Sequence, residues 1–329
     1  MIVTRSPLRI SIGGGGTDLA SYYTKFGGYL ISAAIDKYVY ITINDRFVDE
    51  LLVKYTKLED VKTIGLLKHT IVKEALYSLG YTALDSPNME IVSIADIPSG
   101  TGLGSSGSFT TALLKALYQH SGKLIHPKDL AELACNIEID KLGAPIGKQD
   151  QYIAAFGGIT CFTFNPDHTV IAEPLQISKE TLYNLEDNLM LFFTGYTHIA
   201  GDVLAEQNTK SMCYDKDMIE NLHTVKAMGY EAQGYLLSGD LPKYAELLNR
   251  HWEIKKHRST SMTNSEIDRY YNIAMQSGAI GGKLVGSGAG GFLLFYSEQH
   301  SKLRKALAQE GLKEVRMRFD FEGTKVITS

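Results

Sequence analysis

The sequence predicts an α+β protein of two domains, and three observations lead to this prediction. The chain has 329 residues, and a single hydrophobic core rarely grows past ~250–300 residues. Its first third alternates apolar and polar residues with a period of two, which is typical of strands. From about residue 200 onward the apolar residues recur with helical spacing. Strands and helices are therefore partly segregated along the chain, as in an α+β fold.

In the first half, segments rich in β-branched and aromatic residues predict strands over 2–12, 38–43 and 89–94. Apolar residues on one face predict a helix over 65–79. Further helices are expected over 108–119 and 128–142, the second opened by Pro127, which suits a first-turn position.

In the second half, helices are expected over 202–237, 241–256 and 266–276. Thr263 and Glu266 have the spacing of a capping box that opens the last of these. A strand over 291–296, a helix over 299–309 and closing strands around 315–321 follow. The segment 165–178 is the least regular, so we expect domains of residues 1–175 and 176–329.

Composition restricts the class of partner. The net charge is −4 and no long basic run occurs, so neither nucleic acid nor a membrane is expected as a partner. The three cysteines are too few and too scattered for a disulfide framework or a zinc site, which suits a reducing compartment. The N-terminus lacks a signal-peptide pattern, and no apolar run is long enough to span a bilayer. We therefore expect a cytoplasmic protein that acts on a small molecule, with a homodimer left open.

Glycine is concentrated in three short runs, at 13–18, 100–108 and 281–291. Ordering glycine is entropically costly, so three such runs indicate backbone that approaches a ligand. The middle run follows a strand and precedes an apolar helix. Free N–H groups and the positive end of a helix dipole would therefore meet there, and such a place binds phosphate. Ser105, Ser106 and Ser108 add hydroxyls for phosphate or Mg²⁺, although each could equally cap the helix.

The same run also satisfies a dinucleotide-binding pattern through Gly102, Gly104 and Gly107. That pattern expects an acidic residue at the end of a second strand about 20 positions later. Asp129 and Glu132 lie instead within a predicted helix, so a nicotinamide-dependent oxidoreductase remains only a distant alternative.

Together the three runs resemble the motifs of the GHMP kinases, a family named for galactokinase, homoserine, mevalonate and phosphomevalonate kinases. Residues 98–108 are similar to its Pro-x-x-x-Gly-Leu-Gly-Ser-Ser phosphate loop, residues 7–18 to its N-terminal substrate motif, and residues 281–291 to its C-terminal glycine motif. The resemblance spans nearly the whole chain. It implies a two-domain fold, with an N-terminal α/β domain like that of ribosomal protein S5 and a C-terminal α+β domain, and it implies ATP and Mg²⁺ as cofactors.

The resemblance also implies roles for individual residues. Asp150 would accept the proton of the attacking hydroxyl, and Arg9 would favour the ionised carboxylate and offset charge on the transferred group. Ser106 and Glu138 would hold Mg²⁺, with Asp140 as the fallback ligand. ATP would be bound by the phosphate loop, through Pro98, Gly100, Gly102, Leu103, Gly104, Ser105, Ser106, Gly107 and Ser108.

The substrate motifs point to a sugar. The resemblance implies that a polyol is bound by Gly14, Gly15, Gly16, Thr17, Asp18, Gly288 and Gly290. Gly15 and Gly16 stand where galactokinases carry a Glu-His pair, which disfavours galactose. Within the family the motifs are most similar to the kinases of heptose phosphates. This similarity implies phosphorylation of D-glycero-D-manno-heptose 7-phosphate at its anomeric hydroxyl, in the synthesis of nucleotide-activated heptose for surface polysaccharide.

Three questions stay open at this point. An L-fucose-type kinase is the alternative within the family, and a sugar-sensing binding protein descended from such kinases is the alternative without catalysis. A sugar phosphate would need a basic anchor, for which the candidates are Lys141, Lys148, Lys283 and Arg258.

Overall fold

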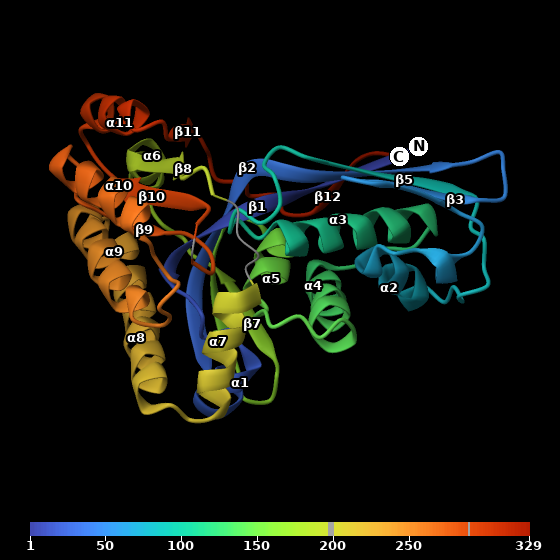
Figure 1. Ribbon diagram of the computed structural model, residues 1–329, viewed down its shortest axis with the longest axis horizontal. Helices are drawn as coiled ribbons and strands as arrows, with labels where there is room; N and C mark the ends of the chain where they lie inside the picture. The colour runs from blue at the N-terminus through green and yellow to red at the C-terminus, as the bar shows by residue number, and fades with distance from the viewer. Residues whose placement is uncertain (197–200, 289) are drawn as a thin grey trace.

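The computed structural model describes residues 1–196, 201–288 and 290–329. Within these residues the strands form two sheets (Figure 1). The larger sheet has the order β12 (Lys325–Thr328), β1 (Ile2–Gly14), β2 (Gly28–Asp45), β5 (Met89–Ala95), β3 (Leu51–Lys54) and β4 (Leu58–Val61). It is extended by β6 (Ile159–Phe164), which pairs with β2, and by β7 (Val170–Pro174), which pairs with β6. The smaller sheet has the order β11 (Lys313–Val315), β8 (Leu189–Phe193), β10 (Phe292–Tyr296) and β9 (Gly281–Leu284).

Strands β1 and β2 are long enough to serve both halves of the molecule. The 18-residue β2 pairs with β5 over residues 39–45 and with β6 over residues 28–33. One face of this sheet packs against α2 (Thr70–Ser78), α3 (Ser105–His120), α4 (Pro127–Cys135) and α5 (Gln149–Phe156). The other end of β1 and β2 packs against α8 (Lys216–Ser238).

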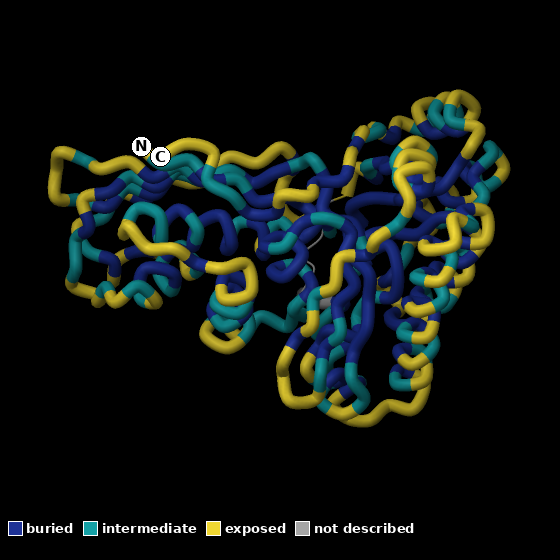
Figure 2. Tube along the Cα trace, turned by 180° about the vertical axis from the view of Figure 1, so that it is seen from behind, coloured by how far each residue is buried: buried dark blue, intermediate teal, exposed yellow. Residues whose placement is uncertain are grey.

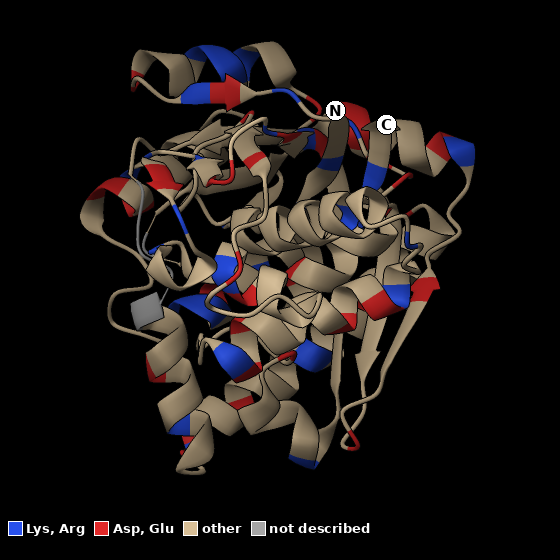
Figure 3. Cartoon of the chain, turned by 90° about the vertical axis from the view of Figure 1, so that its right-hand side faces the viewer, with Lys and Arg blue, Asp and Glu red and all other residues tan. Residues whose placement is uncertain are grey.

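The remaining helices surround the smaller sheet and the open end of the larger one (Figure 1). They are α1 (Ala20–Phe26), α6 (Lys179–Asn188), α7 (Gly201–Met212), α9 (Leu241–Lys256), α10 (Ser265–Gln276) and α11 (His300–Gln309), and a short 3₁₀ turn, η1 (Ile64–Leu66), precedes α2. Figure 2 shows the buried residues concentrated along the strands and the inward faces of the helices. Figure 3 shows Lys and Arg interspersed with Asp and Glu along the chain. No helix in the described residues is long and apolar enough to cross a membrane.

Three of the expected helices are shorter or differently divided. The helix expected over 202–237 is two helices, α7 and α8, because Tyr214 adopts a left-handed backbone (φ 53°) and Asp215 caps α8 by accepting a bond from Met218 N at 2.8 Å. The helix expected over 65–79 is reduced to η1 and α2. The helix expected over 128–142 is α4 followed by a π-helical turn, η2 (Asn136–Lys141). Such wide turns are rare in helices and are frequent at functional sites.

Two expectations near the C-terminus were also wrong in detail. The closing strands are β11 and β12, whereas residues 316–321 run beside Asp36 and Ala34 through isolated backbone bonds. The capping box is not used either. Asn264 caps α10, since its Oδ1 accepts bonds from Glu266 N at 3.0 Å and Ile267 N at 2.9 Å. The division at residues 175 and 176 stays a prediction; the segment chosen as irregular contains β7, and β12 returns from the second half to pair with β1.

Candidate functional site

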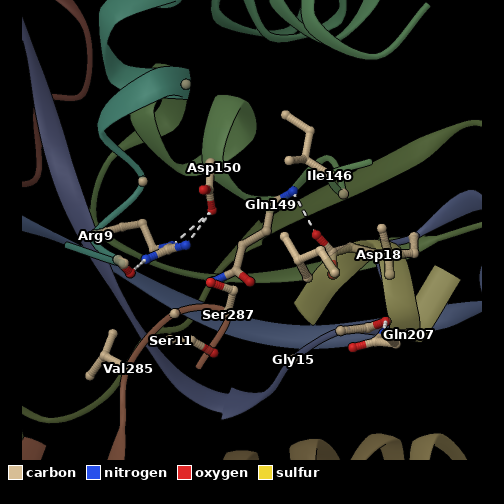
Figure 4. A pocket seen from close by; sticks show the side chains of 18 of the residues that line it. Arg9, Ser11, Gly15, Asp18, Ile146, Gln149, Asp150, Gln207, Val285 and Ser287 are labelled. Carbon is tan, nitrogen blue, oxygen red and sulfur yellow. Dashed lines mark hydrogen bonds and ion pairs between the residues drawn. The ribbon is translucent and has the colours of Figure 1, made fainter. Parts of the chain in front are cut away.

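The three glycine runs meet around one cavity of about 260 Å³. Its walls come from the end of β1, the N-terminus of α3, the loop before α5, the end of α9 and the turn after β9. Segments far apart in the sequence therefore supply one pocket (Figure 4). Of the expected site residues, those that line it are Arg9, Gly14, Gly15, Gly16, Asp18, Gly100, Gly102, Gly104, Ser105, Ser106, Gly107, Glu138 and Asp150.

Arg9 and Asp150 form the central ion pair of the cavity (Figure 4). Arg9 Nε and Nη2 each lie 2.8 Å from Asp150 Oδ1. Arg9 Nη1 also donates to the carbonyl of Gly102, and the Arg9 amide donates to the carbonyl of Leu103 at 3.0 Å. The arginine thus links the carboxylate to the glycine loop. The side chain of Asp150 is 29% exposed, so it can meet a ligand in the cavity.

The glycine loop opens α3 with its free N–H groups toward the cavity. Gly104 is the N-cap in a left-handed conformation (φ 76°), and Ser105 and Ser106 form the first turn. Gly107 allows α5 to approach closely, because a Cβ there would lie 2.9 Å from both the carbonyl carbon and the Cβ of Asp150. A helix N-terminus with an arginine beside it is a site that favours phosphate.

Three members of the expected phosphate loop lie away from the cavity. Leu103 is fully buried in the core between the two halves. Ser108 donates to the carbonyls of Pro7 at 2.7 Å and Gly104 at 3.1 Å, so its hydroxyl fastens the loop to β1. Pro98 does not line the cavity, and its carbonyl accepts a bond from Thr101. These residues shape the loop and leave ligand contact to their neighbours.

Glu138 and Ser106 form a second polar pair beside the loop. Ser106 Oγ donates to Glu138 Oε2, and Gln151 Nε2 donates to Glu138 Oε1 at 3.0 Å. Burial raises the pKa of Glu138, and the hydrogen bonds from Ser106 and Gln151 oppose that rise. The fallback ligand, Asp140, is exposed and bonds to Asn136 instead. The described residues contain no cluster of three or more His, Cys, Asp or Glu side chains for a metal.

In the N-terminal substrate motif, Asp18 lines the cavity, whereas the side chain of Thr17 stabilises the fold. Asp18 is buried, and its Oδ2 accepts a bond from Gln149 N at 3.1 Å (Figure 4). Burial raises the pKa of Asp18. Thr17 has no exposed surface, and its hydroxyl exchanges bonds with the carbonyl and amide of Tyr29 at 2.9 and 3.1 Å. The Thr17 hydroxyl is therefore not available to a sugar.

The residues of the C-terminal glycine motif that line the cavity are not the ones expected from the sequence. Val285, Gly286 and Ser287 line the cavity, whereas Gly288 and Gly290 do not. Gly288 is buried against Met262, whose Sδ would lie 2.3 Å from an added Cβ. The residues before the expected pair thus face the ligand.

The sequence analysis also missed Gln207, His251 and Lys255, which line the cavity. Gln207 Nε2 donates to the carbonyl of Gly16 at 2.8 Å. Lys255 carried a signal, since it continues the buried face of α9 from Leu248 at helical spacing. Of the proposed basic anchors, Arg258 and Lys283 line the cavity, while Lys148 pairs with Glu132 at 3.2 Å and Lys141 is exposed.

Comparison with known proteins agrees with this geometry. The family models for the GHMP kinase N-terminal and C-terminal domains match residues 69–158 and 232–313. A D-glycero-alpha-D-manno-heptose 7-phosphate kinase of Campylobacter jejuni is 31% identical, with 98% of each chain covered. A bifunctional fucokinase/GDP-fucose pyrophosphorylase of Arabidopsis thaliana is 24% identical over 94% of this chain and 31% of its own length.

Two solved structures are similar throughout. A D-glycero-D-manno-heptose 1-phosphate kinase from Bacteroides thetaiotaomicron has a TM-score of 0.82 at 24% identity, covering 100% of this chain and 99% of its own. A sugar kinase described as putative, from Campylobacter jejuni, has a TM-score of 0.78 at 28% identity, covering 99% and 97%.

The chain belongs to the GHMP kinases and has their two-domain fold. It is an ATP-dependent phosphotransferase that acts on a hydroxyl group. The topology also removes the oxidoreductase alternative. The glycine loop follows β5 and opens α3, which leads into α4 and not into a strand parallel to β5; the parallel partner of β5 is β3, which precedes the loop. In dinucleotide-binding units the helix after the glycine loop instead joins two parallel strands.

Proposed function

We propose that the protein transfers the γ-phosphoryl group of ATP to the anomeric hydroxyl of D-glycero-D-manno-heptose 7-phosphate and forms the 1,7-bisphosphate. The observation that carries the phosphoryl-transfer chemistry is the Arg9–Asp150 pair at the N-terminus of α3. The heptose phosphate is supported by the similarity to the Campylobacter jejuni kinase, which extends over 98% of both chains. The product would serve the synthesis of nucleotide-activated heptose for surface polysaccharide, in the cytoplasm.

Each side chain has a role that its position supports. The N–H groups at the start of α3 bind the phosphates of ATP. Asp150 accepts the proton of the attacking hydroxyl, and Arg9 orients that carboxylate and offsets the charge that develops on the transferred group. Asp18 and the backbone of Gly14 to Gly16 bind the sugar, with Gln207 beside them. Because phosphoryl transfer needs little covalent help from the protein, positioning and electrostatics supply most of the catalysis.

Magnesium is supported by the pair formed by Ser106 and Glu138. Both donors are oxygens, which Mg²⁺ prefers, and the buried Glu138 carboxylate has no cationic side chain bonded to it among the described residues. These two side chains would hold the ion beside the ATP phosphates. When bound, the ion neutralises charge on the phosphates.

An L-fucose-type kinase is the second candidate. Gly15 and Gly16, which occupy the places of the galactokinase Glu-His pair, favour it, as does the similarity to the Arabidopsis thaliana fucokinase. A panel of D-glycero-D-manno-heptose 7-phosphate, L-fucose, galactose and mannose, tested for ATP consumption, separates the candidates. The heptose phosphate is expected to have the highest kcat/KM by at least ~100-fold. Faster turnover of L-fucose or galactose would refute the substrate and leave the kinase activity standing.

A further inference from the structure

Three cations from the second half of the chain are buried in the wall of the cavity. Lys255 lies near the end of α9, Arg258 follows it, and Lys283 lies on β9. Their exposed fractions are 6%, 4% and 2%. We call these three residues the buried cation cluster. Burying a charge without an opposite charge is strongly unfavourable, so their presence in a cavity calls for an explanation.

The hydrogen-bond partners of the cluster are neutral groups. Lys255 Nζ donates to the carbonyls of Leu284 at 2.9 Å and Gly286 at 2.5 Å. Arg258 donates to Asn221 Oδ1 at 2.9 Å and to the carbonyl of Gly15 at 3.1 Å. Lys283 Nζ lies 3.3 Å from Nδ1 of the buried His251.

No ion pair within 4.0 Å joins the cluster to a carboxylate in the described part of the chain. The charge of Asp18 reaches Arg258 but does not balance three cations. Positive charge on the cluster is therefore not balanced by a contacting carboxylate.

The charges of the cluster oppose one another. Burial, with the nearby Arg258 and Arg9, lowers the pKa of Lys283 to about 7. Burial and the same neighbours, together with Lys283, hold the pKa of Lys255 well below its usual range. Burial also lowers the pKa of Arg258 to about 10. A bound dianion would relieve this repulsion and accept charge-assisted hydrogen bonds from the ammonium and guanidinium groups.

The cluster extends from the glycine loop to the substrate motif. Lys255 bonds to Gly286, which packs against Gly102 of the loop before α3, whereas Arg258 bonds to Gly15 of the substrate motif. Arg258 therefore places one end of the cluster on the side of the acceptor. We propose that the buried cation cluster binds a phosphate group carried by the sugar, so that the acceptor is a sugar phosphate and not a free sugar. This inference rests on the proposed kinase function. The same chemistry would suit the phosphates of ATP, and the experiment must distinguish the two sources.

The test compares Lys283→Met and Arg258→Met with the wild-type enzyme. Each is assayed with ATP and either D-glycero-D-manno-heptose 7-phosphate or the corresponding free heptose. In the wild type, kcat/KM is expected to be at least ~100-fold higher for the phosphorylated acceptor. Each variant should lower that value by at least ~10-fold through KM, while KM for ATP changes by less than ~2-fold. Because Arg258 also holds the carbonyl of Gly15 in the substrate motif, the comparison with free heptose uses Lys283→Met alone, and its kcat/KM for the free heptose should change by less than ~2-fold. Lys226→Met is the matched control, because Lys226 donates to the carbonyl of Phe26 at 2.7 Å outside the cavity.

Each contrary result has its own meaning. Equal kcat/KM of the wild type for the two acceptors would overturn the inference and leave the kinase activity intact. A rise in KM for ATP in the variants, with KM for the sugar phosphate unchanged, would assign the cluster to the nucleotide. Absence of turnover with any sugar would refute the proposed function. In that case calorimetric titration with inorganic phosphate still decides: binding to the wild type that Lys283→Met abolishes supports the subsite, and no binding to the wild type rejects it.

Discussion

Arg9 and Asp150 lie 141 positions apart in the sequence, yet two nitrogens of the arginine contact the same carboxylate oxygen at 2.8 Å. The same guanidinium holds the carbonyl of Gly102. One side chain on β1 thus fixes both the carboxylate on α5 and the loop before α3. Because the donors of arginine lie in a rigid plane, Nε and Nη2 can face the carboxylate while Nη1 faces the carbonyl, a fixed geometry that a flexible lysine ammonium does not provide.

Replacing Asp150 with Asn should lower kcat by ~10²–10⁴-fold, since the amide cannot accept the proton of the hydroxyl. ATP affinity, measured by calorimetry, should change by less than ~3-fold, because the phosphates are bound mainly by backbone amides. Asp140→Asn, at an exposed position in η2, is the control and should behave as wild type. Near-normal turnover of Asp150→Asn would remove this residue from the role of base.

Glu138→Gln should raise the Mg²⁺ concentration needed for half-maximal activity by at least ~10-fold, because it removes a charged ligand and keeps the shape of the side chain. It should also stabilise the ligand-free protein. A carboxylate whose pKa is raised by burial destabilises the fold once pH exceeds its unfolded pKa, so the gain in Tm should be full at pH 8 and absent near pH 4. An unchanged Mg²⁺ requirement would exclude Glu138 as a ligand.

Gly107→Ala should lower kcat by ~10–100-fold. The added Cβ would meet the backbone of Asp150 at 2.9 Å and force α5 away from α3, and a shift of about 1 Å can cost that much in rate. Gly234→Ala is the matched control. It lies in α8 with nothing within 4 Å of an added Cβ, so it should keep full activity and gain up to ~1 kcal/mol of stability. Equal activity of the two variants would show that the contact between α3 and α5 tolerates displacement.

The pH dependence of kcat/KM for the phosphorylated acceptor should report the titration of Lys283. Its neighbours in the cavity wall are His251 and Lys255 on α9, with Arg258 and Arg9 close enough for their charges to act. Since its pKa is lowered to about 7, kcat/KM for the phosphorylated acceptor should fall as pH rises above that value. The decline should be absent in Lys283→Met. A fall of the same size in that variant would assign the titration to another group.

The same lysine should affect stability. A lysine with a lowered pKa destabilises the folded state while it is charged, and this cost is full below pH 7 and disappears above its unfolded pKa of ~10.4. Lys283→Met should therefore raise Tm by ~2 °C or more at pH 6 and by less at pH 9. Differential scanning calorimetry at both values measures this difference. A lower Tm at pH 6 would mean that the ammonium stabilises the ligand-free fold.

Thr17→Val should act on stability and leave substrate binding unchanged. The substitution leaves the buried amide and carbonyl of Tyr29 without their partner, which should cost ~1–3 kcal/mol in denaturant unfolding. KM for the acceptor should stay within ~2-fold of wild type. A large rise in KM at unchanged stability would restore Thr17 as a substrate ligand.

Site residues were predicted best from the sequence where the residue types allow few backbone conformations. Gly104 and the serines after it could be recognised because a glycine loop followed by an apolar helix has few other uses. Thr17 and Ser108 could not be assigned. A hydroxyl that closes a backbone bond and one that faces a ligand look the same in sequence, and only the pairing with Tyr29 or Pro7 distinguishes them.

The sequence also did not predict where the fold places several residues of the site and of the larger sheet. Glu138 lies on a π-helical turn that apolar periodicity did not reveal. Lys255 was missed because a lysine on a helix is usually exposed, and only its position on the apolar face of α9 argued otherwise. The extent of β2 was underestimated because residues 28–35 are apolar apart from Ser32 and show no alternation, as expected for a strand covered on both faces.

Strand β12 joins the first sheet from the far side of the chain, where Thr328 pairs with Val3 and Lys325 with Arg5. During synthesis on the ribosome, one edge of β1 therefore stays unpaired until β12 has left the ribosome, after nearly every other element. A fragment ending before residue 325 would leave that edge free to pair with another molecule. We therefore expect the larger sheet to be completed only after β12 has been translated. A purification tag fused near β12 should leave the edge of that strand free to pair with β1.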